Sequence, residues 1–201
     1  MTRISRSTFA LMTASALALA ACSKGEAPPI ENGDVAMGNG AGDAGDNAMA
    51  GVPVSFALTG GDGATRGSVT IAEDPAGLTI NVSARGLPVG AHGIHLHEKG
   101  LCEGPKFASA GGHWNPAAKK HGRDNPAGAH LGDLANLEVG ADGSASVSIP
   151  IEGVTTASGA NMLADADGTA IVIHAKADDY KTDPSGDSGD RVACAVLAPS
   201  K

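Results

Sequence analysis

The chain has 201 residues, a formal net charge of −8, 29 glycines and only 2% aromatic residues. The negative charge argues against non-specific binding to nucleic acid, which basic proteins achieve by neutralising phosphates. Many small residues, with β-branched residues in short runs, favour one all-β domain with a sizeable core.

The first 21 residues have the pattern of a secretory signal peptide. Arg3 and Arg6 precede the apolar run 9–21, which is too short to span a bilayer as a permanent helix. The run ends in Leu-Ala-Ala before Cys22, as in the lipobox of bacterial lipoproteins. Cys22 is therefore expected to become a lipid-modified N-terminus. The alternative is an ordinary cleaved signal peptide with an incidental cysteine.

Residues 22–51 contain the lipidated cysteine and then a stretch rich in Gly, Ala, Pro, Asn and Asp. This stretch has no periodic apolar pattern and cannot bury enough surface to offset the entropy of ordering it, so we expect a flexible tether. The globular domain is expected over residues 52–201. The signal and the lipid together indicate the periplasmic side of a bacterial cell envelope, with the membrane contacted only through the anchor.

From Val52 onward, apolar and polar residues alternate in short runs, which is the pattern of half-buried β-strands. We expect about eight strands, at 52–58, 69–71, 78–82, 94–97, 134–139, 145–149, 170–174 and 192–197. Asp142-Gly143 predicts a tight hairpin, and Asp62-Gly63 and Asp167-Gly168 predict other turns. The pattern therefore predicts an antiparallel barrel or sandwich.

Two long connections, 98–133 and 175–191, interrupt the strands, and such loops on a rigid barrel usually carry function. His95 and His97 stand two apart, so both side chains leave a strand on the same face. Histidine is concentrated around the first connection. Six histidines and one aspartate form a complete ligand set for two metal ions: His95, His97, His113, His121, His130, His174 and Asp133.

Several motifs, in order and with matching spacing, carry a resemblance to a known family: HGIHLHEKGLC, GGHWNP, the following His121, GAHLGDLAN, IVIHAKADD and GDRVACAV. Together they resemble the copper/zinc superoxide dismutases in their bacterial secreted form. The resemblance covers residues 53–197. It implies an eight-stranded antiparallel Greek-key barrel. It also implies an enzyme that converts superoxide to oxygen and hydrogen peroxide by copper redox cycling, with zinc in a structural role.

The resemblance divides the ligand set between the two metals. Four imidazoles suit copper in both of its oxidation states, and they come from His95, His97, His113 and His174. Three imidazoles and one carboxylate suit a closed tetrahedral zinc site, and they come from His113, His121, His130 and Asp133. His113 belongs to both sets because an imidazole that loses both ring protons can bridge two cations. Taken alone, His95 and His97 could be surface positions on an exposed strand, and His121 would more often be a surface histidine than a ligand. His130 and Asp133 alone would be ordinary loop residues.

The resemblance also gives roles to residues outside the ligand sets. Asp178 corresponds to a carboxylate that accepts N–H bonds from one ligand of each metal, here His95 and His121, and so fixes their orientation. Arg191 corresponds to the arginine that guides and holds the superoxide anion. His113 would act in catalysis as well, by taking and delivering a proton. The alternatives are a solvated loop acid for Asp178 and a surface ion pair for Arg191.

Cys102 and Cys194 correspond to the family's intrasubunit disulfide, which persists in the oxidising compartment indicated by the signal peptide. The alternative is two free thiols in the core. His92 shares the interior face of its strand with Ile94 and Leu96, and we interpret it as a structural histidine.

A periplasmic copper-binding or copper-buffering module on the same fold is the second functional hypothesis. Loss of a zinc ligand, of Asp178 or of Arg191 would favour it, and the sequence retains all of them. Superoxide is the expected small-molecule partner, and the protein is expected to be a monomer or a homodimer. Lys119, Lys176 and Lys181 are candidates for a positive field that attracts this anion.

Overall fold

The computed structural model of the protein describes residues 53–201. The predicted signal peptide, the predicted lipid site at Cys22, the predicted tether and Val52 lie outside the described residues. No helix of the described part is long and apolar enough to cross a bilayer.

The described residues form nine strands and one short 3-10 helix, and the fold is all-β as predicted. The strands are β1 (Val54–Gly60), β2 (Thr65–Asp74), β3 (Gly77–Arg85), β4 (Gly90–His92), β5 (Ile94–His97), β6 (Leu137–Val139), β7 (Ser144–Glu152), β8 (Thr169–His174) and β9 (Arg191–Ala198), and the 3-10 helix is Ala108–Ala110.

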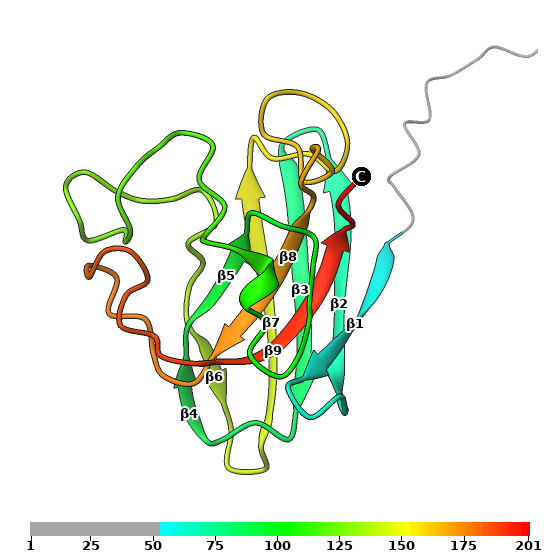
Figure 1. The fold of residues 1–201 in the computed structure, drawn as a ribbon, viewed down its shortest axis with the longest axis vertical. Coiled ribbons are helices and arrows are strands. Elements are labelled where there is room, and N and C mark those ends of the chain that lie inside the picture. Colours follow the sequence, from blue (N-terminus) through cyan, green and yellow to red (C-terminus); the bar gives the residue numbers. More distant parts are fainter. Residues whose placement is uncertain (1–52) are drawn as a thin grey trace, which may run out of the picture. The chain divides into compact units, whose positions relative to one another are not determined.

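Seven strands form one antiparallel sheet in the order β5-β8-β9-β1-β2-β3-β7, and β4 pairs with β6 in a second sheet (Figure 1). Each strand of the small sheet is followed in the chain by an edge strand of the large one: β4 by β5, and β6 by β7. A single residue, Gly93, separates β4 from β5, and the predicted hairpin at Asp142-Gly143 leads from β6 into β7. The strands thus form the predicted antiparallel Greek-key barrel.

Period-2 alternation produces the core of the barrel. In β3 the side chains of Leu78, Ile80 and Val82 are buried, and the polar residues between them are more exposed. Ile80 faces Ile149 of β7 across the sheet and has no exposed surface. Truncating a residue buried in this way typically costs about 2–5 kcal/mol.

From the sequence, His92 is expected on the same strand as residues 94–97. In the structure the chain is divided at Gly93, so that β4 pairs with β6 and β5 pairs with β8. The Gly93 N–H donates to the carbonyl of Lys176, and its own carbonyl accepts from the backbone N–H of His174, at 2.7 and 2.8 Å. A Cβ atom at this position would lie 2.8 Å from the Cβ of Ser188, so the close approach requires glycine. This contact sets β5 against β8.

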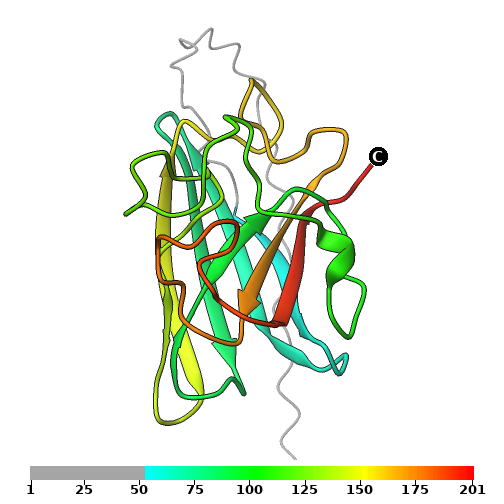
Figure 2. The same cartoon turned by 60° about the vertical axis from the view of Figure 1, so that its left-hand side comes forward.

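The part of the first long connection that follows the 3-10 helix lies beside the second long connection in both views (Figures 1 and 2). Asp183 of the second connection accepts hydrogen bonds from the backbone N–H of His121 and from the ammonium group of Lys120 in the first, at 2.9 and 3.0 Å. The predicted disulfide between Cys102 and Cys194 is present, and it ties the first connection to β9. Closing a loop of 92 residues in this way removes chain entropy from the unfolded state worth about 4–5 kcal/mol.

Candidate metal centre

Strand pairing brings the histidines together. His95 and His97 leave β5 on the face opposite Ile94 and Leu96, which belong to the core. β5 pairs with β8, whose last residue is His174. The first long connection then returns to this face, where His113 bridges to His97 and Asp133 bridges to His95 through backbone pairing.

The first group of donors contains four histidines whose ligand atoms all lie within 4.8 Å of one another: His95, His97, His113 and His174. One ring nitrogen of each is held from outside the group. His95 Nε2 lies 2.8 Å from a carboxylate oxygen of Asp178, and His113 Nδ1 lies 2.9 Å from Asp133 Oδ1. The Nδ1 atoms of the other two histidines lie 3.1 and 3.2 Å from the carbonyls of Gly111 and Gly189.

The remaining nitrogen of each of these four rings is buried without a hydrogen-bond partner in the described part of the chain: His95 Nδ1, His97 Nε2, His113 Nε2 and His174 Nε2. Buried polar atoms are normally satisfied, and leaving one unpaired costs about 1–3 kcal/mol. Because the outer nitrogens face carbonyl or carboxylate oxygens, they are the ones that carry the protons, and the inner nitrogens present lone pairs. Converging lone pairs of this kind fit a metal ion.

The second group contains His113, His121, His130 and Asp133. Oδ1 of Asp133 lies 2.9, 3.0 and 3.1 Å from the Nδ1 atoms of the three histidines. Oδ2 of the same carboxylate accepts the backbone N–H groups of Gly122 and His130 at 2.9 and 3.0 Å. His113 therefore presents one nitrogen to each group, and the carboxylate holds the second group together.

Asp178 lies between the two groups and is only 3% exposed. Its Oδ2 lies 2.8 Å from His95 Nε2, and its Oδ1 lies 3.0 Å from His121 Nε2. The carboxylate thus contacts Nε2 of one histidine in each group. The Nδ1 atom of each of these histidines is then left to face the other donors of its own group. Such an outer partner fixes the tautomer and the orientation of a ligand.

Burial and hydrogen bonds to carboxylates together set the pKa values of these histidines. Burial lowers the pKa of His113 to about 4 and that of His174 to about 3, and it also lowers the pKa values of His95 and His97. Burial also opposes the charge of His121, but hydrogen bonds to the carboxylates of Asp133 and Asp178 outweigh it and raise the pKa of His121 to about 9. At neutral pH the first group is uncharged and ready to donate lone pairs.

These shifts predict a stability maximum near neutral pH for the metal-free protein. As the pH falls below about 6.5, the unfolded chain binds protons that folded His113 and His174 refuse until about pH 4 and 3, so stability is lost. As the pH rises from about 6.5 toward 9, the unfolded chain releases a proton that folded His121 keeps, so the stability contributed by His121 is lost. Each proton that is bound in only one of the folded and unfolded states changes the free energy of unfolding by about 1.4 kcal/mol per pH unit. Urea unfolding of the metal-free protein from pH 5 to 9 measures this, and a steady rise across the range would contradict it.

Arg191 begins β9 at the edge of the same site. Its guanidinium group donates from Nη1 to the carbonyl of Phe107 and from Nη2 to the carbonyl of Gly111, both at 2.6 Å. It lines a hollow of about 560 Å³ together with His113, His130 and His174. The residue makes no ion pair within residues 53–201. Arg191 is thus a fixed cation beside the first group.

Two charged residues near this hollow were not predicted from the sequence. Glu98 lines it, and the Glu98 carboxylate accepts the backbone N–H of Gly112 at 3.0 Å. Lys106 shares an adjoining hollow of about 450 Å³ with Arg191. Lys106 lies four residues after Cys102, in the loop that the disulfide joins to β9. This spacing is the sequence signal that could have placed Lys106 near Arg191. Of the three lysines suggested from sequence, none lines either hollow, and Lys176 lies 3.9 Å from Asp187.

His92 stands apart from both groups. It is 2% exposed, and its ring nitrogens lie 2.7 and 2.8 Å from the carbonyls of His174 and Pro88. Both nitrogens are occupied by the backbone, which agrees with its interpretation as a structural histidine.

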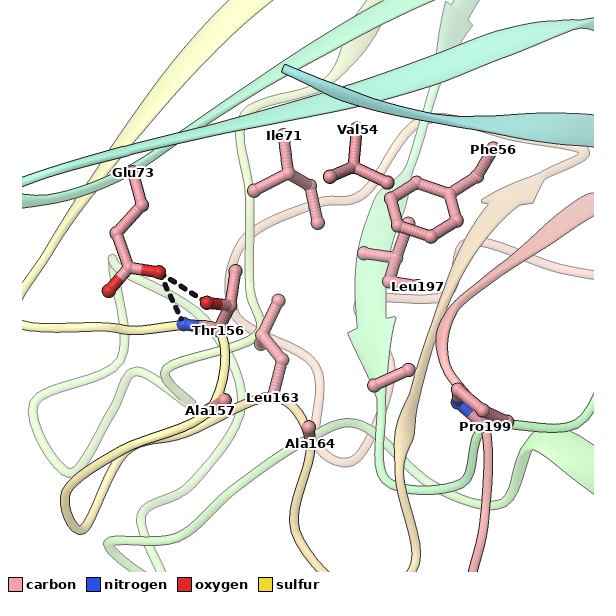
Figure 3. Close-up of a pocket in the computed structure, with 11 residues that line it drawn as sticks. Val54, Phe56, Ile71, Glu73, Thr156, Ala157, Leu163, Ala164, Leu197 and Pro199 are labelled. Atoms are coloured by element: carbon pink, nitrogen blue, oxygen red, sulfur yellow. Dashed lines mark hydrogen bonds between the residues drawn. The ribbon is translucent and has the colours of Figure 1, made fainter. Parts of the chain in front are cut away.

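Another hollow, of about 370 Å³, shares no residue with the metal centre (Figure 3). Apolar side chains from β1, β2, the end of β9 and the segment between β7 and β8 line it, among them Phe56, Ile71, Leu163 and Leu197. Its carboxylate, from Glu73, accepts hydrogen bonds from the backbone and hydroxyl of Thr156. The only ionisable side chain of this lining is therefore engaged by Thr156.

The comparisons with known proteins agree with this geometry. A family model described as copper/zinc superoxide dismutase (SODC) matches residues 65–197. The superoxide dismutase-like protein YojM of Bacillus subtilis is 47% identical over 143 residues, which span 70% of this chain and 73% of that protein. A Cu-Zn superoxide dismutase of Caulobacter vibrioides is 46% identical over 140 residues, 68% of this chain and 80% of that protein.

Solved structures show the same fold. A double mutant of a superoxide dismutase-like protein from Bacillus subtilis superposes with a TM-score of 0.69 at 46% identity, covering 72% of this chain and 96% of that one. The Cu/Zn superoxide dismutase of Brucella abortus has a TM-score of 0.56 at 29% identity, covering 73% and 99%.

Proposed function

The chain belongs to the copper/zinc superoxide dismutase family, and from that premise we propose that it converts superoxide to oxygen and hydrogen peroxide. The observation that carries the proposal is the convergence of four buried ring nitrogens that have no hydrogen-bond partner in the described part of the chain. A protein without a metal to bind would pay for this arrangement in stability.

The residues present fit copper on one side of the centre. His95 would bind through Nδ1, and His97, His113 and His174 would bind through Nε2, because these are the atoms left free by the outer hydrogen bonds. Four imidazole nitrogens suit Cu(II) and tolerate Cu(I). Copper, when bound, supplies the one-electron redox chemistry that the conversion of superoxide requires.

The residues present fit zinc on the other side. Asp133 and the Nδ1 atoms of His113, His121 and His130 would supply three nitrogens and one carboxylate oxygen. Such a set suits a closed tetrahedral site with a structural role. His113 would be shared between the two metals, since its two nitrogens face different groups.

The chain itself contributes anion binding, proton transfer and geometry. The fixed guanidinium of Arg191 lies in the hollow with His113 and His174, where it would attract and orient a small monoanion. His113 would take up a proton at Nε2, which has no other hydrogen-bond partner in the described residues, and would return it to the product. Asp178 would keep His95 and His121 oriented throughout.

Copper binding without dismutation is the second candidate, and the name of the Bacillus subtilis relative, superoxide dismutase-like protein, is the observation that favours it. Metal content and dismutation rate measured on the same purified sample separate the two functions. We expect one copper and one zinc per chain and rapid removal of superoxide. A fully metallated protein without dismutation would make the chain a copper store.

We also propose that the protein is anchored by lipid at Cys22 on the periplasmic side of the cell envelope, because Leu-Ala-Ala-Cys follows an apolar signal segment. Acyl chains contribute about 0.8 kcal/mol per buried CH₂. The wild type is expected to partition with membranes, and Cys22→Ser is expected to yield a soluble or an uncleaved form. Fractionation followed by immunoblotting measures this. Wild-type protein found wholly in the soluble periplasmic fraction would remove the lipoprotein assignment.

A further inference from the structure

Tyr180, the only tyrosine of the chain, lies in the second long connection and has an unusual backbone conformation. Its φ of 62° is in the left-handed region. This conformation costs a bulky residue about 1–3 kcal/mol and persists only where surrounding contacts offset that cost. Strain of this kind is often found close to functional sites. The contacts that hold Tyr180 lead toward the second donor group.

The backbone of Tyr180 joins Asp178 to the residues that follow His121. Its N–H donates to Asp178 Oδ1 at 2.6 Å, and this is the oxygen that also faces His121 Nε2. Its carbonyl accepts the N–H of Asp124 at 3.0 Å. Gly122 packs so closely against this carbonyl that a Cβ atom there would lie 2.0 Å from the oxygen, which only glycine avoids.

The side chain of Tyr180 contacts residues that closely follow two of the proposed zinc ligands, His121 and Asp133. Its hydroxyl accepts the backbone N–H of Asn136, three residues after Asp133, at 2.9 Å. The guanidinium carbon of Arg123, two residues after His121, lies 3.7 Å from the centre of the ring. A cation over an aromatic face is attracted by the ring quadrupole.

The side chain of Asn136 links this part of the chain to Asp178. Its Oδ1 accepts the backbone N–H of Asp178 at 2.8 Å, and its Nδ2 donates to the carbonyl of Asp178 at 3.0 Å. The amide side chain therefore pairs with the backbone of Asp178 on both edges. Together with the hydroxyl of Tyr180, it fixes the distance between Asp178 and the segment that carries Asp133.

We propose that Tyr180 is a positioning residue that sets the affinity and the geometry of the zinc side of the metal centre. Within the described residues it forms no hydrogen bond to a ligand side chain, and it acts through Asp178 and Gly122, whose N–H donates to Asp133 Oδ2 at 2.9 Å. The inference rests on the proposed zinc assignment. It also implies an asymmetry, because the network reaches the copper side only indirectly in the described residues, where Asp178 contacts His95 and where Asp133 contacts the shared His113.

Two substitutions at this position test the proposal in the full-length protein, with Lys181→Ala as the matched control. Lys181 is the exposed next residue, and its side chain takes part in no ion pair within the described residues. Tyr180→Phe removes the hydroxyl alone, and Tyr180→Leu removes the ring. Zn²⁺ affinity is measured by competition with a chromophoric chelator, and geometry by the visible absorption of Co²⁺ bound in place of zinc.

We expect Tyr180→Leu to weaken Zn²⁺ binding by about 10–100-fold, as loss of an outer partner does, and to alter the Co²⁺ spectrum. Tyr180→Phe should weaken it by about two- to tenfold, the usual effect of one lost hydrogen bond. Copper affinity should change less in both variants, and Lys181→Ala should match the wild type.

Equal Zn²⁺ affinity and an unchanged Co²⁺ spectrum in the tyrosine variants would overturn the proposal. Equal weakening of copper and zinc would overturn it too, since it would indicate a general loss of structure. If Tyr180→Leu does not fold, the Tyr180→Phe affinity and spectrum decide alone. Failure of the wild type to bind Zn²⁺ is a different outcome, and it would refute the zinc assignment itself.

Discussion

Asp133→Ala is expected to lose zinc first and to leave copper bound in a protein with a looser loop. The carboxylate lies within 2.9–3.1 Å of all three Nδ1 atoms of its group, so its removal takes away a ligand and the centre of the group. It also leaves the N–H groups of Gly122 and His130 without their acceptor. The copper-side nitrogens of His95, His97 and His174 do not contact Asp133 and should still bind.

The expected loss of thermal stability follows from linkage. A ligand present at about 1,000 times its dissociation constant stabilises the folded state by about 4 kcal/mol. For a domain of this size, 1 kcal/mol corresponds to about 2–4 °C in Tm, so we expect the Tm of the zinc-loaded protein to fall by about 8–16 °C on substitution. Elemental analysis after dialysis and thermal unfolding measure the two effects.

Asp133→Asn is the matched control for this experiment. The asparagine oxygen still accepts the backbone N–H groups, so the variant separates the order of the loop from the charge of the ligand. It should bind zinc more weakly than the wild type but unfold closer to it in the absence of metal. Unchanged zinc stoichiometry in Asp133→Ala would refute the ligand assignment.

Local pattern predicted most of the barrel. Period-2 alternation in Leu78, Ile80 and Val82 identified a strand, and the pair Asp142-Gly143 identified a hairpin, because both signals lie within a few consecutive residues. The division at Gly93 was not predictable in this way. It depends on the backbone of Lys176, which lies in the other long connection and leaves no periodic trace in the sequence.

The expected strand over 134–139 shows the same limit. The structure begins β6 only at Leu137, because the backbone N–H of Asn136 is donated to Tyr180 and its side chain to Asp178. These partners lie 44 and 42 residues away along the chain. Spacing and resemblance identified the histidines, whereas the residues that hold them through distant contacts required coordinates.

Arg191→Ala is expected to lower kcat/KM for superoxide by about tenfold or more while both metals stay bound. The fastest superoxide dismutases approach the diffusional limit of about 10⁸–10⁹ M⁻¹s⁻¹. With a chain of net charge −8 and an anionic substrate, such a rate needs a local positive target. Arg191 lines the hollow with His113 and His174, and we propose that it is this target. Pulse radiolysis or stopped-flow decay of superoxide measures the rate.

Arg191→Lys should lie between the wild type and the alanine variant. The lysine keeps the charge, but a single ammonium cannot reproduce the planar fork that binds the carbonyls of Phe107 and Gly111 together. The carbonyl of Gly111 also faces His97 Nδ1, so a loosened position 191 is expected to affect the copper side as well. The visible spectrum of bound Cu²⁺ in both variants measures that effect independently of the rate.

Arg85→Ala separates local steering from net charge. Arg85 is exposed at the end of β3 and lines neither of the hollows that contain Arg191, yet its removal changes the total charge equally. If the field near the copper side controls the rate, Arg85→Ala should behave as the wild type. Added salt should slow the wild type more than Arg191→Ala, because screening acts on the field that the substitution removes. Equal rates for wild type and Arg191→Ala at low salt would defeat the role assigned to this residue, and an equal loss in Arg85→Ala would attribute the effect to net charge alone.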